Sequence, residues 1–346
     1  MTPVAGSVTT NNHFTHYTPG RCRITATTDV RPAADQFRAG LLLALGSAFA
    51  FGMSGPLGKS LMEAGWSPTA AVTARLAGGA LAMAAFATAM NRTWVREALA
   101  HWRTVLAYGA VPIAGAQFCY YNAVSHLSVG VALLIEYTAP ILVVGWLWAT
   151  TGRRPASLTL AGVALAVAGI TLVLNVFSDA HINLTGVGWA MVAAVCAACY
   201  FMMSDEVSTE EGGLNPVTLA AGGLIVGAVA VALLGASRVM PMTFTSADTM
   251  VAGIATPWFV PVIAMALIPT AIAYTLGIMG VARLRPRFAS LVGLSEVMFA
   301  VLTAWVLLGE SLAAVQVVGA AVVLAGLVLA RLGDRTERLA PAEPPM

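Results

Sequence analysis

Residues 129–155 read VGVALLIEYTAPILVVGWLWATTGRRP, and this stretch decides the class of fold. A helix needs roughly 20 apolar residues to cross a hydrocarbon core about 30 Å thick, and the run that ends near Thr150 has that length. Glu136 lies inside the run, four residues before Pro140. An ionisable side chain at that depth is costly and normally has a function. The stretch therefore predicts a membrane-spanning helix with a functional interruption.

The rest of the chain repeats this apolar pattern. Of its 346 residues, 58% are hydrophobic and 10% are charged, whereas a soluble domain has about 25% charged residues. Continuously apolar segments favour helices over a β-barrel. The sequence thus predicts an all-α polytopic membrane protein with ten transmembrane helices at 39–59, 68–90, 104–123, 129–150, 157–177, 185–204, 216–236, 259–280, 288–308 and 312–331.

The positive charges predict the orientation of these helices. With the N-terminus in the cytoplasm, the inside segments hold all of the 18 Lys and Arg residues except three. The outside loops hold Lys59 and Arg238, and Arg75 falls within a span. This bias predicts a multi-pass protein of the cytoplasmic (inner) membrane with both termini in the cytoplasm. Residues 1–37 are expected to be a disordered cytoplasmic tail or an over-extended start, and 333–346 a second cytoplasmic tail.

An internal repeat divides the span region in two. A shift of 157 positions places Pro112 on Pro269, and the same shift places Gly162 on Gly319. The predicted repeats are residues 38–178 and 179–332, with five helices each. Because five is odd, the second repeat must enter the membrane from the opposite side. Inverted repeats are a recurring plan of secondary transporters, in which the substrate lies between the halves near the midplane. The alternative is a duplication that only made a stable bundle.

Three ionisable residues lie inside predicted spans, namely Arg75, Glu136 and Glu296. Buried glutamates are candidates for a proton site or for pairing with a substrate ammonium. Arg75 is a candidate substrate contact, or it pairs with a carboxylate that locks two helices together. The polar side chains of the third and eighth spans are candidates for a hydrated cavity or for interhelical hydrogen bonds. The expected substrate pathway consists of Arg75, Gln117, Tyr121, Asn122, Glu136, Tyr137, Tyr274 and Glu296.

Prolines are expected to kink three of these helices. Proline lacks the N–H that would bond to the carbonyl four residues earlier, so Pro140 frees the carbonyl of Glu136. Pro112 and Pro269 are expected to act in the same way in the third and eighth helices. Broken helices at the midplane are common sites of substrate binding in transporters.

Other classes of function lack their sequence signatures. The chain has no zinc-protease, nucleophile-elbow or nucleotide-loop motif, so an enzyme embedded in the membrane is a weaker alternative. A scaffold without transport is a third alternative. The five histidines lie outside the spans or at their edges, so no metal site is expected. We also expect no cofactor and no nucleic-acid partner. The expected partners are a small-molecule substrate and the lipid bilayer, while proton coupling and a homodimer stay open.

Several motifs resemble a known group of transporters. They are GPLGKSL and TARLAGG in the first two helices, VGVALLIEYTAP in the fourth, and RLRPRFASLVGLSEVMFAVLTAWVLLGESL in the ninth. Between residues 39 and 332 the chain looks like the drug/metabolite transporter superfamily in its EamA-domain branch, and within it most like the threonine/homoserine exporters. Positions that match the family pattern are Lys59, Arg75, Glu136, Pro140, Glu296 and the pair Gly309-Glu310. A proline often follows the glutamate of the ninth helix in the family, and Val297 stands there in this chain.

The resemblance implies export of a small metabolite, most of all an amino acid of the threonine/homoserine type, by alternating access. It leaves another solute open, such as a drug-like cation, a sugar or a nucleobase.

Overall fold

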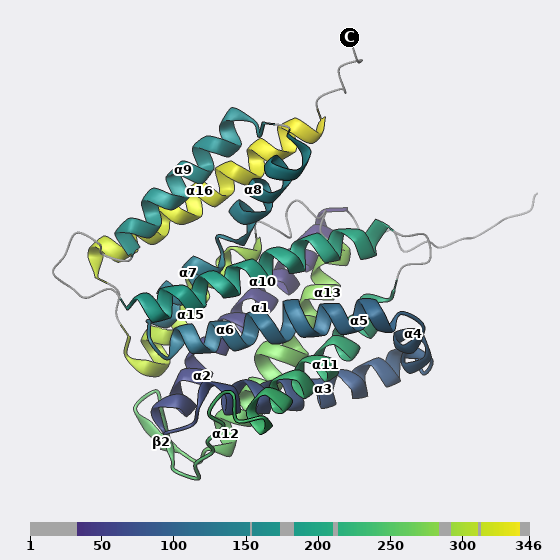
Figure 1. Ribbon diagram of the computed structural model, residues 1–346, viewed down its shortest axis with the longest axis vertical. Coiled ribbons are helices and arrows are strands. Elements are labelled where there is room, and N and C mark those ends of the chain that lie inside the picture. Colours follow the sequence, from purple (N-terminus) through teal and green to yellow (C-terminus); the bar gives the residue numbers. More distant parts are fainter. Residues whose placement is uncertain are drawn as a thin grey trace, which may run out of the picture.

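The computed structural model describes residues 33–152, 154–173, 183–209, 214–283, 292–310 and 313–339. These residues form a helical bundle with one small hairpin at one end (Figure 1). Most of the expected tails, residues 1–32 and 340–346, lies outside the described residues. Helix α1 begins at Ala33, and α16 continues to Leu339, so both helices extend into ranges that were expected to be tails.

The first part of the bundle runs from α1 to α9. Its elements are α1 (Ala33–Gly52), α2 (Ser54–Glu63), α3 (Pro68–Met90), α4 (Trp94–Ala100), α5 (Trp102–Tyr108), the π-helical segment η1 (Gly109–Gly115), α6 (Ala116–Val124), α7 (Val129–Glu136), α8 (Ala139–Thr151) and α9 (Ser157–Val173). The first expected span is thus two helices that meet at Met53. The short helix α4 occupies a stretch that sequence analysis treated as a connecting loop.

The second part runs from α10 to α16. Its elements are α10 (Leu184–Thr209), α11 (Pro216–Ala236), strands β1 (Thr249–Val251) and β2 (Ile254–Thr256), α12 (Phe259–Ala266), the π-helical segment η2 (Leu267–Ile272), α13 (Ala273–Arg283), α15 (Ser295–Leu308) and α16 (Ala314–Leu339). The two strands pair antiparallel, and Thr249 lies opposite Thr256. The hairpin was not expected, because it lies in the loop between two spans.

Length and composition show which helices can cross a bilayer. Within the described residues, five stretches are long and apolar enough: Phe37–Glu63, Pro68–Met90, Val129–Thr150, Pro216–Ala236 and Phe259–Gly277. Four shorter apolar helices join them, at Ser157–Leu172, Leu184–Tyr200, Ser295–Leu308 and Ala314–Ala330. Large apolar side chains such as Leu81 and Leu184 are each 76% exposed. Such exposure suits a surface that faces lipid.

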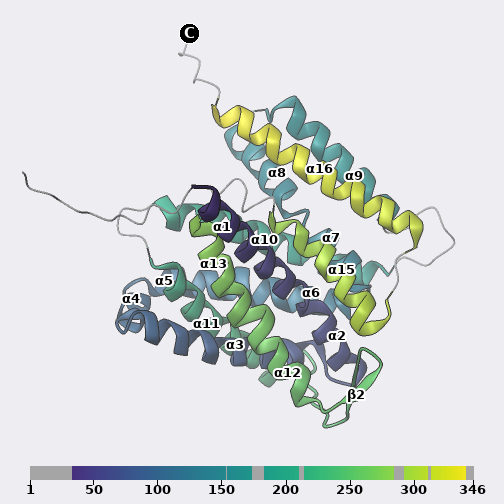
Figure 2. The same ribbon diagram turned by 180° about the vertical axis from the view of Figure 1, so that it is seen from behind.

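Glycines bring α9 and α16 into direct backbone contact, and Figures 1 and 2 show these two helices side by side. A Cβ on Gly162 would lie 2.6 Å from the Gly326 carbonyl oxygen, and one on Gly169 would lie 2.9 Å from the Gly319 carbonyl oxygen. The glycine nearer the start of α9 contacts the glycine nearer the end of α16, so the two helices run antiparallel. Small residues permit this close approach in membranes.

Other helices also pair across the two parts of the chain. Helix α3 packs against α11, α1 against α13, and α6 against α10. The core between them contains Leu61, Leu76, Leu134 and Leu224, each at most 1% exposed. The polar side chains described next lie within this core.

Candidate functional site

Arg75 lies at the centre of the candidate site. It is the eighth residue of α3, which begins with an N-cap at Ser67 and with Pro68 in its first turn. A rise of about 1.5 Å per residue places Arg75 roughly 10 Å inside the helix end. Its side chain is 2% exposed. A guanidinium at this depth keeps its positive charge, since arginine stays protonated in proteins.

Among the described residues, the hydrogen-bond acceptors of the Arg75 guanidinium are all neutral. Nη1 donates to Ser54 Oγ on α2 and to Gln117 Oε1 on α6. On the other side, Nη2 donates to the Pro269 carbonyl oxygen over 3.3 Å, and Nε donates to Thr270 Oγ1 over 3.4 Å. Within the described residues no carboxylate lies at ion-pair distance from Arg75. The expected carboxylate lock is therefore not seen in this part of the chain, although Arg75 does connect several helices.

Tyr121 extends this polar cluster. Its hydroxyl lies 3.4 Å from Arg75 Nη1 and 3.0 Å from the Ser54 carbonyl oxygen. The Arg75 guanidinium carbon lies 5.8 Å from the centre of the Tyr121 ring, within the range of a cation–π contact. The same hydroxyl lies 3.0 Å from the sulfur of Met265. The cluster thus joins α2, α3 and α6 to α12 and η2.

Prolines lie where the third and eighth helices change geometry. Pro112 is buried inside η1, and Pro269 is buried inside η2. A π-helical turn is wider than an α-helical turn and is often found at functional sites. The Pro269 carbonyl oxygen, which accepts a hydrogen bond from Arg75, lies within η2. Sequence analysis expected kinks at these two positions, and the structure places a π-helical segment at each.

The fourth expected helix is interrupted beside its glutamate. Helix α7 ends at Glu136, and α8 begins at Ala139 with Pro140 in its first turn. Tyr137 lies in the break and donates its hydroxyl to Glu296 Oε2 over 2.7 Å. The hydroxyl also lies 3.2 Å from the Gly293 carbonyl oxygen. Tyr137, which lies in the break, therefore links the fourth expected helix to the ninth.

The side chain of Glu136 is half-buried, and its carboxylate forms no hydrogen bond or ion pair with any described residue. It lies near enough to Glu296 and to Arg75 to interact electrostatically with both. Two carboxylates and one guanidinium thus share one region of the bundle. An ionisable side chain inside an apolar span is costly and normally faces a partner or a cavity.

Two of the expected site residues stand apart from these contacts. Asn122 donates to the Phe118 carbonyl oxygen of its own helix over 2.8 Å, so it stabilises α6 locally. The ring of Tyr274 packs edge-on against Phe51, with the ring centres 5.1 Å apart. Sequence analysis did not select Ser54, which accepts a hydrogen bond from Arg75. A polar serine among glycines within an apolar span could have indicated this residue. Within the described residues no group of three His, Cys, Asp or Glu side chains could hold a metal ion.

The arrangement defines a class of protein, namely a multi-pass helical membrane protein with a polar, charged cluster inside its bundle. Comparison with known families supports and narrows this class. The sequence model of the EamA-like transporter family matches residues 38–175 and 184–332. The chain therefore belongs to the EamA-like transporter family.

Relatives with similar sequences support this membership. The chain is 29% identical to the threonine/homoserine exporter RhtA of Escherichia coli K12, over 81% of this chain and 87% of the relative. It is 28% identical to the threonine/homoserine exporter RhtA of Salmonella typhimurium LT2, over the same shares. An uncharacterized transporter of Archaeoglobus fulgidus is 24% identical over 61% of this chain and 70% of its own length. A solved crystal structure has a similar fold, with a TM-score of 0.58, 19% identity, and coverage of 87% of this chain and 99% of its own.

Proposed function

We propose that this chain is a secondary transporter that exports a small metabolite by alternating access between two inverted five-helix repeats. The proposed substrate is an amino acid of the threonine/homoserine type. The observation that carries this proposal is the buried positive charge of Arg75, whose hydrogen-bond partners among the described residues are all neutral and which interacts electrostatically with the Glu136 carboxylate.

The antiparallel packing of α9 and α16 supports inversion of the repeats. The shift of 157 positions relates Gly162 to Gly319 and Gly169 to Gly326. The contacts cross over, so that Gly162 meets Gly326 and Gly169 meets Gly319. This crossing is what a twofold axis perpendicular to the helices produces. Equivalent helices then point in opposite directions, as inverted repeats require.

Other helix contacts also occur in pairs that are related by exchanging the two proposed repeats. In the proposed repeats, α1 corresponds to α10 and α6 corresponds to α13, and both α1–α13 and α10–α6 are packed pairs. Likewise, α1 packs against α15, and α10 packs against α7 and α8. Each contact thus has a counterpart in which the halves change places. Such pseudo-symmetry gives two related arrangements, one open to each side of the membrane.

The chemistry of the site suits a zwitterion. The carboxylate of an amino acid would be attracted to Arg75, and its ammonium to Glu136 or Glu296. Arg75 is almost fully buried, so the substrate reaches it only after the helices around it separate. Alternating access provides this separation. The two named exporters among the relatives support the same class of substrate.

The proposed orientation has both termini in the cytoplasm, as the distribution of arginines predicts. Flux measurements test the direction of transport and its coupling to a proton gradient. Cells that overproduce the protein would be loaded with labelled threonine, homoserine, other amino acids, sugars or cationic drugs, and efflux would be followed with and without a pH gradient. Selective efflux of small amino acids is the expected result, and no faster efflux of any solute than from control cells would refute the proposal.

Glu136→Gln tests the site within the same assay. It keeps the shape of the side chain and removes its charge, so we expect efflux to fall at least tenfold while the protein still inserts. Glu63→Gln is the matched control, because Glu63 is exposed at the end of α2. Unchanged efflux in Glu136→Gln would remove Glu136 from the mechanism.

A further inference from the structure

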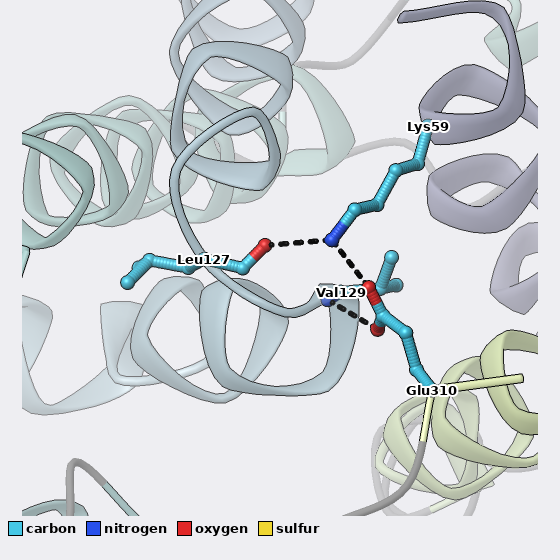
Figure 3. A network of polar contacts seen from close by, with 4 residues as sticks. All are labelled: Lys59, Leu127, Val129 and Glu310. Carbon is cyan, nitrogen blue, oxygen red and sulfur yellow. Dashed lines mark hydrogen bonds and ion pairs between the residues drawn. The ribbon is translucent and has the colours of Figure 1, made fainter. Parts of the chain in front are cut away.

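A second charged cluster lies at the end of the bundle where α2 and α15 finish. Figure 3 shows Lys59 of α2 directed at Glu310, which follows α15. The Lys59 ammonium forms an ion pair with Glu310 Oε1 and also donates to the Leu127 carbonyl oxygen over 3.3 Å. The second carboxylate oxygen, Oε2, accepts the Val129 backbone N–H over 3.1 Å. Both oxygens of Glu310 are therefore used.

The backbone around this cluster directs Glu310 toward α7. Gly309 has a φ of +71°, a left-handed conformation that ends α15 and that favours glycine. The Gly309 N–H bonds to the Trp305 carbonyl oxygen over 3.0 Å, and the Glu310 N–H bonds to that of Ala304 over 3.3 Å. Val129 is the first residue of α7, so its N–H has no partner within its own helix. A carboxylate at this positive end of the helix dipole is favourable.

The cluster connects the two halves of the molecule. Lys59 and Val129 belong to the first proposed repeat, and Glu310 belongs to the second. Within the described residues, Lys59–Glu310 is the only ion pair. Each of its side chains is 20% exposed, so water can replace the contact when the pair separates. The connection therefore joins two elements and can separate reversibly, in contrast to a fully buried pair.

We propose that Lys59, Glu310 and the Val129 N–H form a latch that keeps the outer end of the transport pathway closed and that separates when the protein opens outward. This inference rests on the proposed function for the orientation of the chain and for the two alternating arrangements. Lys59 lies in α2, at the predicted outer end of the first span, and Glu310 follows a helix that ends on the same side in the proposed topology. Charge attraction at this end then favours the conformation that is closed to the outside.

Accessibility of a buried cysteine tests the latch without requiring transport. The four native cysteines would be replaced by serine, and Thr303→Cys would serve as the reporter. Thr303 is 6% exposed and donates to the Gly52 carbonyl oxygen over 3.0 Å, about two helical turns below Glu310. A membrane-impermeant maleimide would be added to right-side-out and to inverted vesicles, so that each face is tested separately.

The variants to compare are Lys59→Gln, Glu310→Gln and the exchange Lys59→Glu/Glu310→Lys. We expect Lys59→Gln and Glu310→Gln to raise the labelling rate from the outside about tenfold, which corresponds to about 1.4 kcal/mol. The exchange restores the ion pair, but a lysine cannot accept the Val129 N–H, so we expect only partial restoration of slow labelling. Arg238→Gln is the control, since it removes an exposed positive charge from the same predicted face.

Equal labelling rates in the reporter protein, Lys59→Gln and Glu310→Gln would overturn the latch, as would faster labelling only from the opposite face. A second measurement separates this result from failure of the proposed function. In Lys59→Cys/Glu310→Cys, with the native cysteines replaced, a short bis-thiosulfonate cross-linker forms a disulfide with each thiol and releases a sulfinate from each end; it should stop efflux, and reduction should restore it. Continued efflux in the cross-linked protein also contradicts the latch. Absence of efflux in every variant, with labelling that still depends on the ion pair, would instead refute the transport proposal alone.

Discussion

At the scale of single residues, Arg75 combines almost full burial with a positive charge that has no ion-pair partner among the described residues. Arg75→Lys keeps the charge but loses the planar fork that reaches Ser54 and Gln117 on one side and Pro269 on the other. Hydrogen bonds to charged groups contribute about 1.5–3 kcal/mol each. We expect efflux to fall at least tenfold and the melting temperature of the purified protein to drop. The control is Arg96→Lys, an exposed site on α4, which should match the unmodified protein in both assays.

Tyr137 offers a residue-scale test of the contact between the fourth and ninth expected helices. Its hydroxyl donates to Glu296, so Tyr137→Phe and Glu296→Ala, each of which removes one partner, should have effects on stability that are not additive. Directly interacting residues typically show coupling energies of about 0.5–3 kcal/mol in double-mutant cycles. Thermal or denaturant unfolding of the two single variants and the double variant measures this coupling. Additive effects would show that the hydrogen bond contributes nothing to the folded state.

At the scale of elements, the π-helical segments set the register of the residues that follow them. Gln117 and Tyr121 come after η1, and both contact Arg75. Proline inside a helix costs about 3 kcal/mol or more, so Pro112→Ala allows α5, η1 and α6 to form one regular helix. We expect lower efflux, because Gln117 and Tyr121 would rotate away from Arg75, and no gain in melting temperature, because the lost hydrogen bonds offset the relief of removing the proline. Pro241→Ala, in an exposed loop, is the control.

The pair α9 and α16 depends on glycine at its closest contact. A Cβ on Gly162 would lie 2.3 Å from the Ala330 nitrogen, so even alanine forces the two backbones apart. Overpacking costs about 1–3 kcal/mol. We expect Gly162→Val to lower the yield of folded protein in the membrane and its melting temperature. Gly145→Val should change neither, since nothing lies within 4 Å of a Cβ at Gly145. Equal behaviour of the two variants would contradict this packing.

The sequence predicted the helices better than it predicted their contacts. Hydropathy locates α3 and α11 almost to the residue, because lipid imposes the length of an apolar helix. Proline chemistry predicts an interruption at Pro112, but it does not distinguish a kink from a π-helical turn. The partners of Arg75 and the contact between Lys59 and Glu310, 251 positions apart, follow from how helices pack together. Hydropathy shows that a helix lies in the membrane. It does not show which of several possible helices packs against it.

At the scale of the whole molecule, the two proposed repeats depend on one another for folding. Helix α9 of the first repeat packs along α16 of the second, and α1, α3 and α6 each pack against a helix of the other repeat. Separation would expose the glycine surface of α9 and leave Arg75 without its partners on η2. Buried polar groups that lose their hydrogen bonds are destabilising, and small-residue surfaces lose their close contacts.

We therefore predict that residues 1–178 produced alone are degraded, and that residues 179–346 produced alone are degraded as well. Coexpression of the two fragments should recover both in the membrane as a complex, because the contacts between repeats form without a covalent link. Amounts of each tagged fragment after a chase, and copurification through one tag, measure this outcome. Coexpression of the first fragment with Gly326→Val in the second should recover less complex, since Gly326 faces Gly162. Stable, separate fragments would show instead that each repeat has an independent core.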